Sequence, residues 1–159
     1  MDYMGKKLVG IVCGILILAT IYLLFFSNKE KSMDDDILNL NLREHKNIAL
    51  HIHPILDIYI LGKKQILPKD IGVSVNGMRV IHTHDESGKL HIEAPYYHQF
   101  YLKDFFTIWG KTFNSTCILD SCVDEKHKIT VLVNGVENSQ YGDIELKDQD
   151  RIKIYYEEK

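Results

Sequence analysis

Three of the eight histidines of this chain lie close together, on both sides of the pair Ser87-Gly88. A hairpin with its tip at this pair would place His84 opposite His91 and His82 opposite Glu93. Because side chains alternate between the two faces of a strand, all four groups would then point the same way. Imidazole nitrogens and a carboxylate oxygen gathered on one face are typical of a metal site. We therefore predict a metal site at these four residues.

A second pair, His51 and His53, has the same His-x-His spacing and extends the predicted site to six donors. Imidazole suits zinc, copper, nickel and iron, whereas calcium and magnesium take oxygen-rich shells. The absence of cysteine or methionine among these donors favours Cu(II) or Zn(II) over Cu(I). We expect a copper or zinc ion with three or four protein ligands, and six donors leave room for a second ion. A single His-x-His pair, by contrast, is usually a solvated strand face.

Binding is better supported than catalysis. A hydrolytic zinc site needs an open coordination position and a general base, and the chain contains no HExxH motif. The glutamate spacing after His82 and His84 also departs from the cupin pattern. An enzyme is therefore the less favoured interpretation, with a metal-dependent hydrolase kept as an alternative.

An uncharged apolar run at residues 8–26 has the length of a transmembrane helix. Lys6 and Lys7 precede it, and the positive-inside rule places the N-terminus in the cytoplasm. The run is longer than a signal-peptide core and no small-x-small cleavage site follows it, which favours an uncleaved signal anchor. Gly10 and Gly14 are spaced as GxxxG and would let another helix approach closely.

The cysteines of the exported part are Cys117 and Cys122. In an oxidising compartment two cysteines in a short loop usually form a structural disulfide, so we expect one here. A thiol-disulfide protein is the alternative, although redox pairs usually have CxxC spacing at the start of a helix. Asn114 begins an Asn-Ser-Thr sequence that matches the N-glycosylation pattern.

The rest of the chain predicts a small exported α+β domain, mostly β, behind the N-terminal transmembrane helix. Alternating apolar residues indicate strands from residue 47 to the end, and apolar positions 102, 105, 106 and 109 indicate one short helix that stops at Gly110. The last 30 residues resemble the C-terminal part of β-grasp domains. The predicted organisation is a cytoplasmic segment 1–7, the anchor 8–26, a tether 27–43 and an extracytoplasmic histidine-rich domain 44–159.

Residues 51–110 carry a family resemblance. The segments His51-x-His53-Pro54, Asp70-Ile71-Gly72, IHTHDESGKLHIEAP and FYLKDFFTIWG are similar to an uncharacterised family of membrane-anchored, exported, histidine-rich proteins. That family occurs in archaea, ammonia oxidisers among them, and in some bacteria. The resemblance implies a connection with copper through these organisms, which is an association and not a chemical argument.

Together these patterns predict a single-pass cell-membrane protein whose extracytoplasmic domain binds copper or zinc. Its role would be metal handling or membership of a membrane complex, with other membrane subunits as partners. A different interpretation is a non-catalytic accessory subunit whose histidines contact partners.

The net charge of -3 and the pI near 6.2 provide no basic field for nucleic acid.

Overall fold

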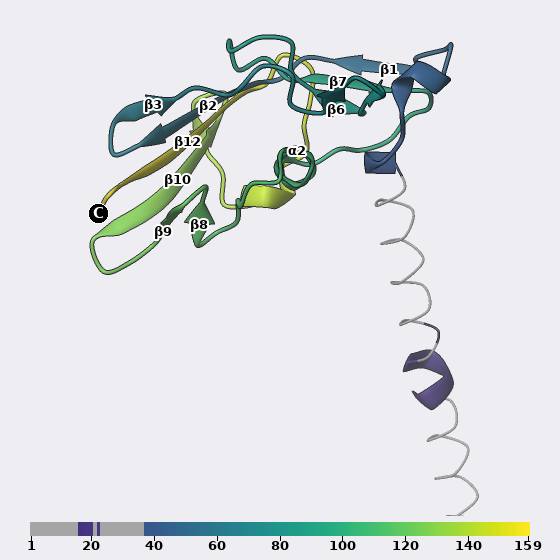
Figure 1. Ribbon diagram of the computed structural model, residues 1–159. Helices are drawn as coiled ribbons and strands as arrows, with labels where there is room; N and C mark the ends of the chain where they lie inside the picture. Colours follow the sequence, from purple (N-terminus) through teal and green to yellow (C-terminus); the bar gives the residue numbers. More distant parts are fainter. Residues whose placement is uncertain (1–15, 21, 23–36) are drawn as a thin grey trace, which may run out of the picture. The chain divides into compact units, whose positions relative to one another are not determined.

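A computed structural model describes residues 16–20, 22 and 37–159 of the chain (Figure 1). Residues 16–20 and 22 are helical. The cytoplasmic segment 1–7, most of the predicted anchor 8–26, and most of the tether lie outside the described residues. Among the residues that are described, no helix combines the length and the apolar character that crossing a membrane requires.

The described chain from Leu38 onward forms one compact unit built mainly from short strands. Its helical elements are η1 (Leu42–Glu44), α2 (Leu102–Trp109) and η2 (Tyr141–Asp143). Its strands are β1 (Leu50–Ile52), β2 (Ile55–Ile60), β3 (Lys63–Gln65), β4 (Val73–Ser74), β5 (Gly77–Met78), β6 (Ile81–His82), β7 (His91–Ala94), β8 (Cys117–Ile118), β9 (Ser121–Cys122), β10 (His127–Val133), β11 (Val136–Glu137) and β12 (Arg151–Glu158). The prediction of a small, mostly β domain is confirmed.

The larger sheet has five strands in the order β11-β10-β12-β2-β3. The central strand β12 runs parallel to β2 and antiparallel to β10, with Ile154 opposite both Ile58 and Val131. These three side chains are almost completely buried, because alternate residues of each strand face the core. The first and last long strands of the domain are therefore neighbours at the centre of this sheet.

The smaller sheet has three strands in the order β1-β7-β6, and these strands carry His51, His91 and His82. One of its faces is apolar, with Ile81, Ile92 and Ala94 fully buried. Alternation along β7 leaves His91 and Glu93 on the opposite, partly exposed face. The apolar face anchors the sheet to the core, and its other face is left free for polar side chains.

Helix α2 forms where the spacing predicted it. Phe105 and Phe106 are buried, and Gly110 follows the helix in the left-handed conformation with φ 69°. The Asp104 carboxylate accepts a hydrogen bond of 2.7 Å from the backbone N–H of Tyr101 and so caps the first turn. The helix contacts β6, the strand that bears His82.

Cys117 and Cys122 lie opposite one another on the short hairpin β8–β9 and form a disulfide. The predicted pairing of these cysteines is confirmed. Asn114, just before the hairpin, is exposed, and its side-chain oxygen accepts hydrogen bonds from the backbone and hydroxyl of Thr116. Glycosylation at Asn114 stays a prediction.

Candidate metal centre

The register of the small sheet decides which histidines meet. His82 pairs directly with His91 between β6 and β7, and His51 pairs with Glu93 between β1 and β7. The predicted pairs, His84 with His91 and His82 with Glu93, were therefore wrong. The four residues of these two pairs nevertheless share one face of the sheet, because paired residues lie on the same side and His91 and Glu93 are two positions apart on β7.

The hairpin prediction failed because residues 83–90 form a wide loop rather than a tight turn. The loop returns along the start of β2: the backbone N–H of Leu90 donates to the Pro54 carbonyl at 2.9 Å, and that of Leu56 donates to the Gly88 carbonyl at 2.8 Å. Gly88 has φ 88°, and a Cβ there would collide with the carbonyl oxygen of Leu56. This contact with a distant strand shifts His84 out of the position opposite His91.

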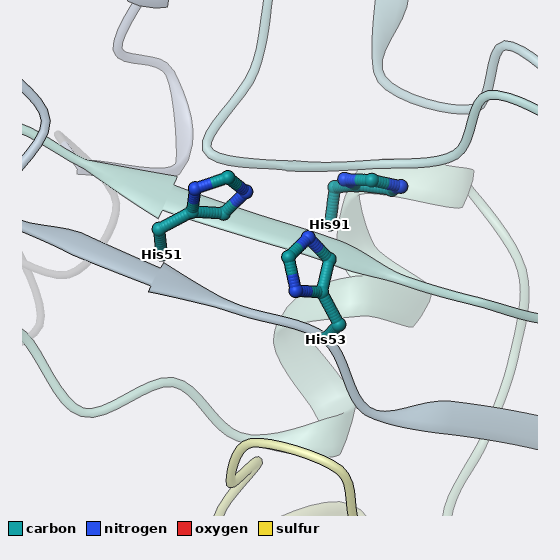
Figure 2. A group of neighbouring side chains, drawn as sticks. All are labelled: His51, His53 and His91. Carbon is teal, nitrogen blue, oxygen red and sulfur yellow. The ribbon is translucent and has the colours of Figure 1, made fainter.

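Five histidines meet on this face as two groups of three that share one member. In the first group, His51, His53 and His91 each offer a nitrogen, and these atoms all lie within 4.8 Å of one another (Figure 2). In the second group, a nitrogen from each of His82, His84 and His91 lies within the same 4.8 Å of the other two. Tetrahedral zinc, with Zn–N bonds of about 2.0–2.1 Å, needs nitrogens about 3.3 Å apart.

The imidazole rings form a continuous cluster around His91. Its ring centroid lies 4.6 Å from that of His53 and 4.5 Å from that of His84. The centroid of His82 is 5.5 Å from His91 and 4.8 Å from His84. On the other flank, the His51 and His53 centroids are 4.5 Å apart. All five histidines that the sequence assigned to the site are thus brought together.

His82 is the donor that the fold prepares most completely. It is fully buried, and its Nδ1 lies 3.0 Å from the carbonyl oxygen of Arg79. Since a carbonyl only accepts, Nδ1 must carry the proton, which leaves the lone pair on Nε2. That Nε2 is buried and has no hydrogen-bond partner. An imidazole held by one nitrogen through a backbone carbonyl, with its other nitrogen free, is the usual arrangement of a metal-bound histidine.

The environment keeps the central histidines neutral. Burial lowers the pKa of His82. Burial, followed by the neighbouring imidazoles of His84 and His53, lowers the pKa of His91 to about 4. A neutral imidazole retains the lone pair that a metal ion needs, so protons compete weakly for these two nitrogens near neutral pH.

Carboxylates lie at one flank of the cluster. Glu93 belongs to neither triad; its Oε1 is 3.1 Å from Nε2 of His51, the position of a carboxylate that orients a histidine, and its role as a ligand stays a prediction. Asp148 is a residue that the sequence analysis missed. It accepts a hydrogen bond of 2.8 Å from the backbone N–H of His53, and its carboxylate is 4.0 Å from Nδ1 of the same histidine. No local pattern around Asp148 indicates this contact.

The remaining histidines lie outside the cluster. His127 contacts the Asp124 carboxylate at 2.8 Å, and the ring of His98 lies 4.7 Å from that of Phe100. His45 is exposed.

In comparisons with known proteins, no family model, curated protein or solved structure matched the chain. The family resemblance of residues 51–110 therefore stays a prediction.

Proposed function

We propose that this chain is a membrane-anchored, extracytoplasmic protein that binds a transition-metal ion, copper or zinc, in the histidine cluster of its small sheet. The observation that carries the proposal is the Nε2 atom of His82, a buried lone pair without a partner inside a cluster of imidazoles. A buried polar atom left unsatisfied costs about 1–3 kcal/mol. A metal ion bound to that nitrogen would satisfy it.

The donor set supports copper or zinc over harder cations. Both triads consist of imidazoles alone, and nitrogen donors suit copper, zinc and nickel. Magnesium and calcium would require oxygen ligands, and the nearest carboxylate, that of Glu93, already contacts His51. Among divalent ions, the Irving–Williams order favours copper where both metals are present.

The location of the domain agrees with this function. The disulfide Cys117–Cys122 suggests a site outside the cytoplasm, where exchangeable metal is met without a competing thiol pool. We propose that residues 8–26 anchor the chain with its N-terminus in the cytoplasm. The domain would then handle metal at the membrane surface or belong to a membrane complex, with the anchor packing against other subunits.

We further propose that the domain is β-grasp-like. The support is its element order: the antiparallel pair β2–β3, helix α2, the antiparallel pair β10–β11, and a last strand β12 that inserts between β2 and β10. The parallel pairing of β12 with β2 at the sheet centre belongs to the same arrangement. In this interpretation the small histidine sheet is an addition to the common framework, formed by β1 and by the segment between β3 and α2.

Metal analysis of the full chain in detergent tests the proposed function. The protein is loaded with Cu(II) or Zn(II), freed of loose metal by dialysis, and its metal content is measured. We expect one tightly bound ion per chain, and loss of it in His91→Ala, which removes the histidine common to both triads. His45→Ala, an exposed histidine outside the cluster, is the matched control. Less than stoichiometric metal in the wild type, or full retention in His91→Ala, would contradict the proposal.

A further inference from the structure

The two triads compete for one side chain. His91 belongs to both, yet a neutral imidazole has a single lone pair, because its other nitrogen carries a proton. His91 therefore completes only one of the triads at a time. Without it, each flank retains just two histidines.

Sheet topology explains why His91 is shared. Strand β7 is the middle strand of the small sheet, with β1 on one side and β6 on the other. Ile52, the last residue of β1, pairs with Ile92, so His53, which follows it, lies beside His91. On the other side His82 pairs with His91 directly. The two triads therefore flank the same ring and differ only in their outer members.

The flanks have different surroundings. The first flank is open to solvent and carries negative charge: the His51 side chain is 52% exposed, and Glu93 lies against it. Asp148 contacts the backbone of His53 on the same flank. The second flank combines the exposed His84 with His82, which is fully buried and is already oriented by the Arg79 carbonyl. One flank is suited to attracting a cation from water and the other to retaining it.

We propose that a single metal ion uses the two triads in turn, loading at His51, His53 and His91 and then passing to His82, His84 and His91. The inference rests on the proposed function. The transfer is a ligand exchange. Bonds from the ion to His51 and His53 break as bonds to His82 and His84 form. His91 is a ligand of the ion both before and after the exchange. Two imidazole ligands replace two others, so no electron is transferred and the oxidation state of the ion does not change.

Loading kinetics of the full chain in detergent test this sequence. Zn(II) is mixed rapidly with metal-free protein, and uptake is followed by competition with a chromophoric chelator. In the double variant His51→Ala/His53→Ala we expect uptake to slow by about tenfold or more, because the ion must then reach the buried His82 without the exposed ligands that first bind it, and association slows when binding requires a rearrangement. The final stoichiometry stays at one ion, and the equilibrium affinity stays within about threefold of wild type, a difference well under 1.4 kcal/mol.

The variant of the other flank has the opposite signature. In His82→Ala/His84→Ala, uptake stays as fast as in wild type, and release to the chelator becomes at least about 100-fold faster because only the open triad remains. His84→Ala alone repeats this measurement without emptying a buried site. Glu93→Gln, which keeps every histidine, slows uptake and leaves release unchanged. His45→Ala matches wild type in both rates.

The outcomes separate the two proposals. If the wild-type chain binds no metal, both fail. If it binds two ions, His91 bridges them as a deprotonated imidazolate, and the sequential inference fails while the proposed function holds. Equal uptake rates in wild type and His51→Ala/His53→Ala, or an equal loss of affinity in both double variants, also overturn the sequential inference alone.

Discussion

The five-stranded and three-stranded sheets each bury one apolar face, yet they fill the opposite face in contrasting ways. On the larger sheet the side chains are complementary neighbours: Tyr59 stacks on Tyr155 at 5.0 Å, and Thr130 donates to Glu157 at 2.8 Å. On the smaller sheet His51 and Glu93 are also complementary, but the pair beside them is not, because His82 lies directly opposite His91. Cross-strand pairs of the first kind stabilise a sheet, whereas imidazoles that both present lone pairs offer each other little.

This contrast is the reason why we assign the large sheet to the stability of the fold and the proposed metal to the small sheet. The large sheet satisfies its own polar groups, and its interior strand β12 is buried at alternate positions along most of its length. The small sheet leaves Nε2 of His82 without a partner. Buried polar groups in proteins are rarely left without a hydrogen-bond partner, and each exception calls for an explanation such as a catalytic role or a bound ion. Four measurements would break or sharpen the comparison.

The largest effect is expected in the core of the large sheet. Ile154→Ala removes a fully buried side chain from the central strand β12, and should lower the free energy of unfolding by about 2–5 kcal/mol. Urea denaturation measures this loss. The neighbour Lys153, which faces the other way, is the matched control, and its alanine variant should change stability by about 0.5 kcal/mol or less. A loss below about 1 kcal/mol in Ile154→Ala would contradict the structural role given to this sheet.

Metal should stabilise the small sheet by a similar but smaller amount. At a free Zn(II) or Cu(II) concentration 100 times the dissociation constant, the free energy of unfolding rises by about 2.7 kcal/mol. Thermal melts with and without metal measure this shift. His91→Ala, which removes the ligand common to both triads, should abolish it, whereas His45→Ala should leave it intact. An equal rise in the His91 variant would place the metal elsewhere.

Acid should destabilise the metal-free protein through the same face. The pKa of His91 is about 4 in the folded chain, and an unfolded histidine titrates near 6.5. Between these values the unfolded chain binds a proton that the folded chain does not. Stability from this source is therefore complete above pH 6.5, falls as the pH drops, and is lost below about pH 4.

The acid effect should be smaller than the metal effect, because His91 is partly exposed and solvent screens its charge. Unfolding curves in the presence of a chelator, measured from pH 7 to pH 4, report it. His91→Gln should show a shallower pH dependence than wild type. Identical slopes for the two proteins would show that His91 is not held neutral by its surroundings.

The smallest expected effects are the pairwise couplings themselves. A double-mutant cycle on Tyr59 and Tyr155 should give a coupling of about 0.5–1.5 kcal/mol beyond the buried area. The same cycle on His82 and His91, without metal, should give a smaller coupling energy. Urea unfolding at neutral pH supplies both values. A histidine coupling as large as the tyrosine coupling would mean that this face is satisfied without a ligand.

Local features of the chain were predictable because local physics determines them. Helix α2 follows from apolar spacing and a terminal glycine, and the closing strand β12 from simple alternation. The disulfide follows from two cysteines in a short loop. The five histidines assigned to the site do come together, and donor type and His-x-His spacing are read directly from the residues, while their binding of a metal stays a prediction.

The sequence by itself determined which donors the candidate site offers: imidazole nitrogens, a donor type that in general suits transition metals rather than calcium or magnesium. Tertiary structure alone decided how the donors combine. Pairing of the loop with β2 moved His82 opposite His91, and a contact across 95 residues brought Asp148 to His53. Strand register depends on hydrogen bonds between segments far apart in the chain, and that is why His91, the residue at the centre of both triads, could not be singled out beforehand.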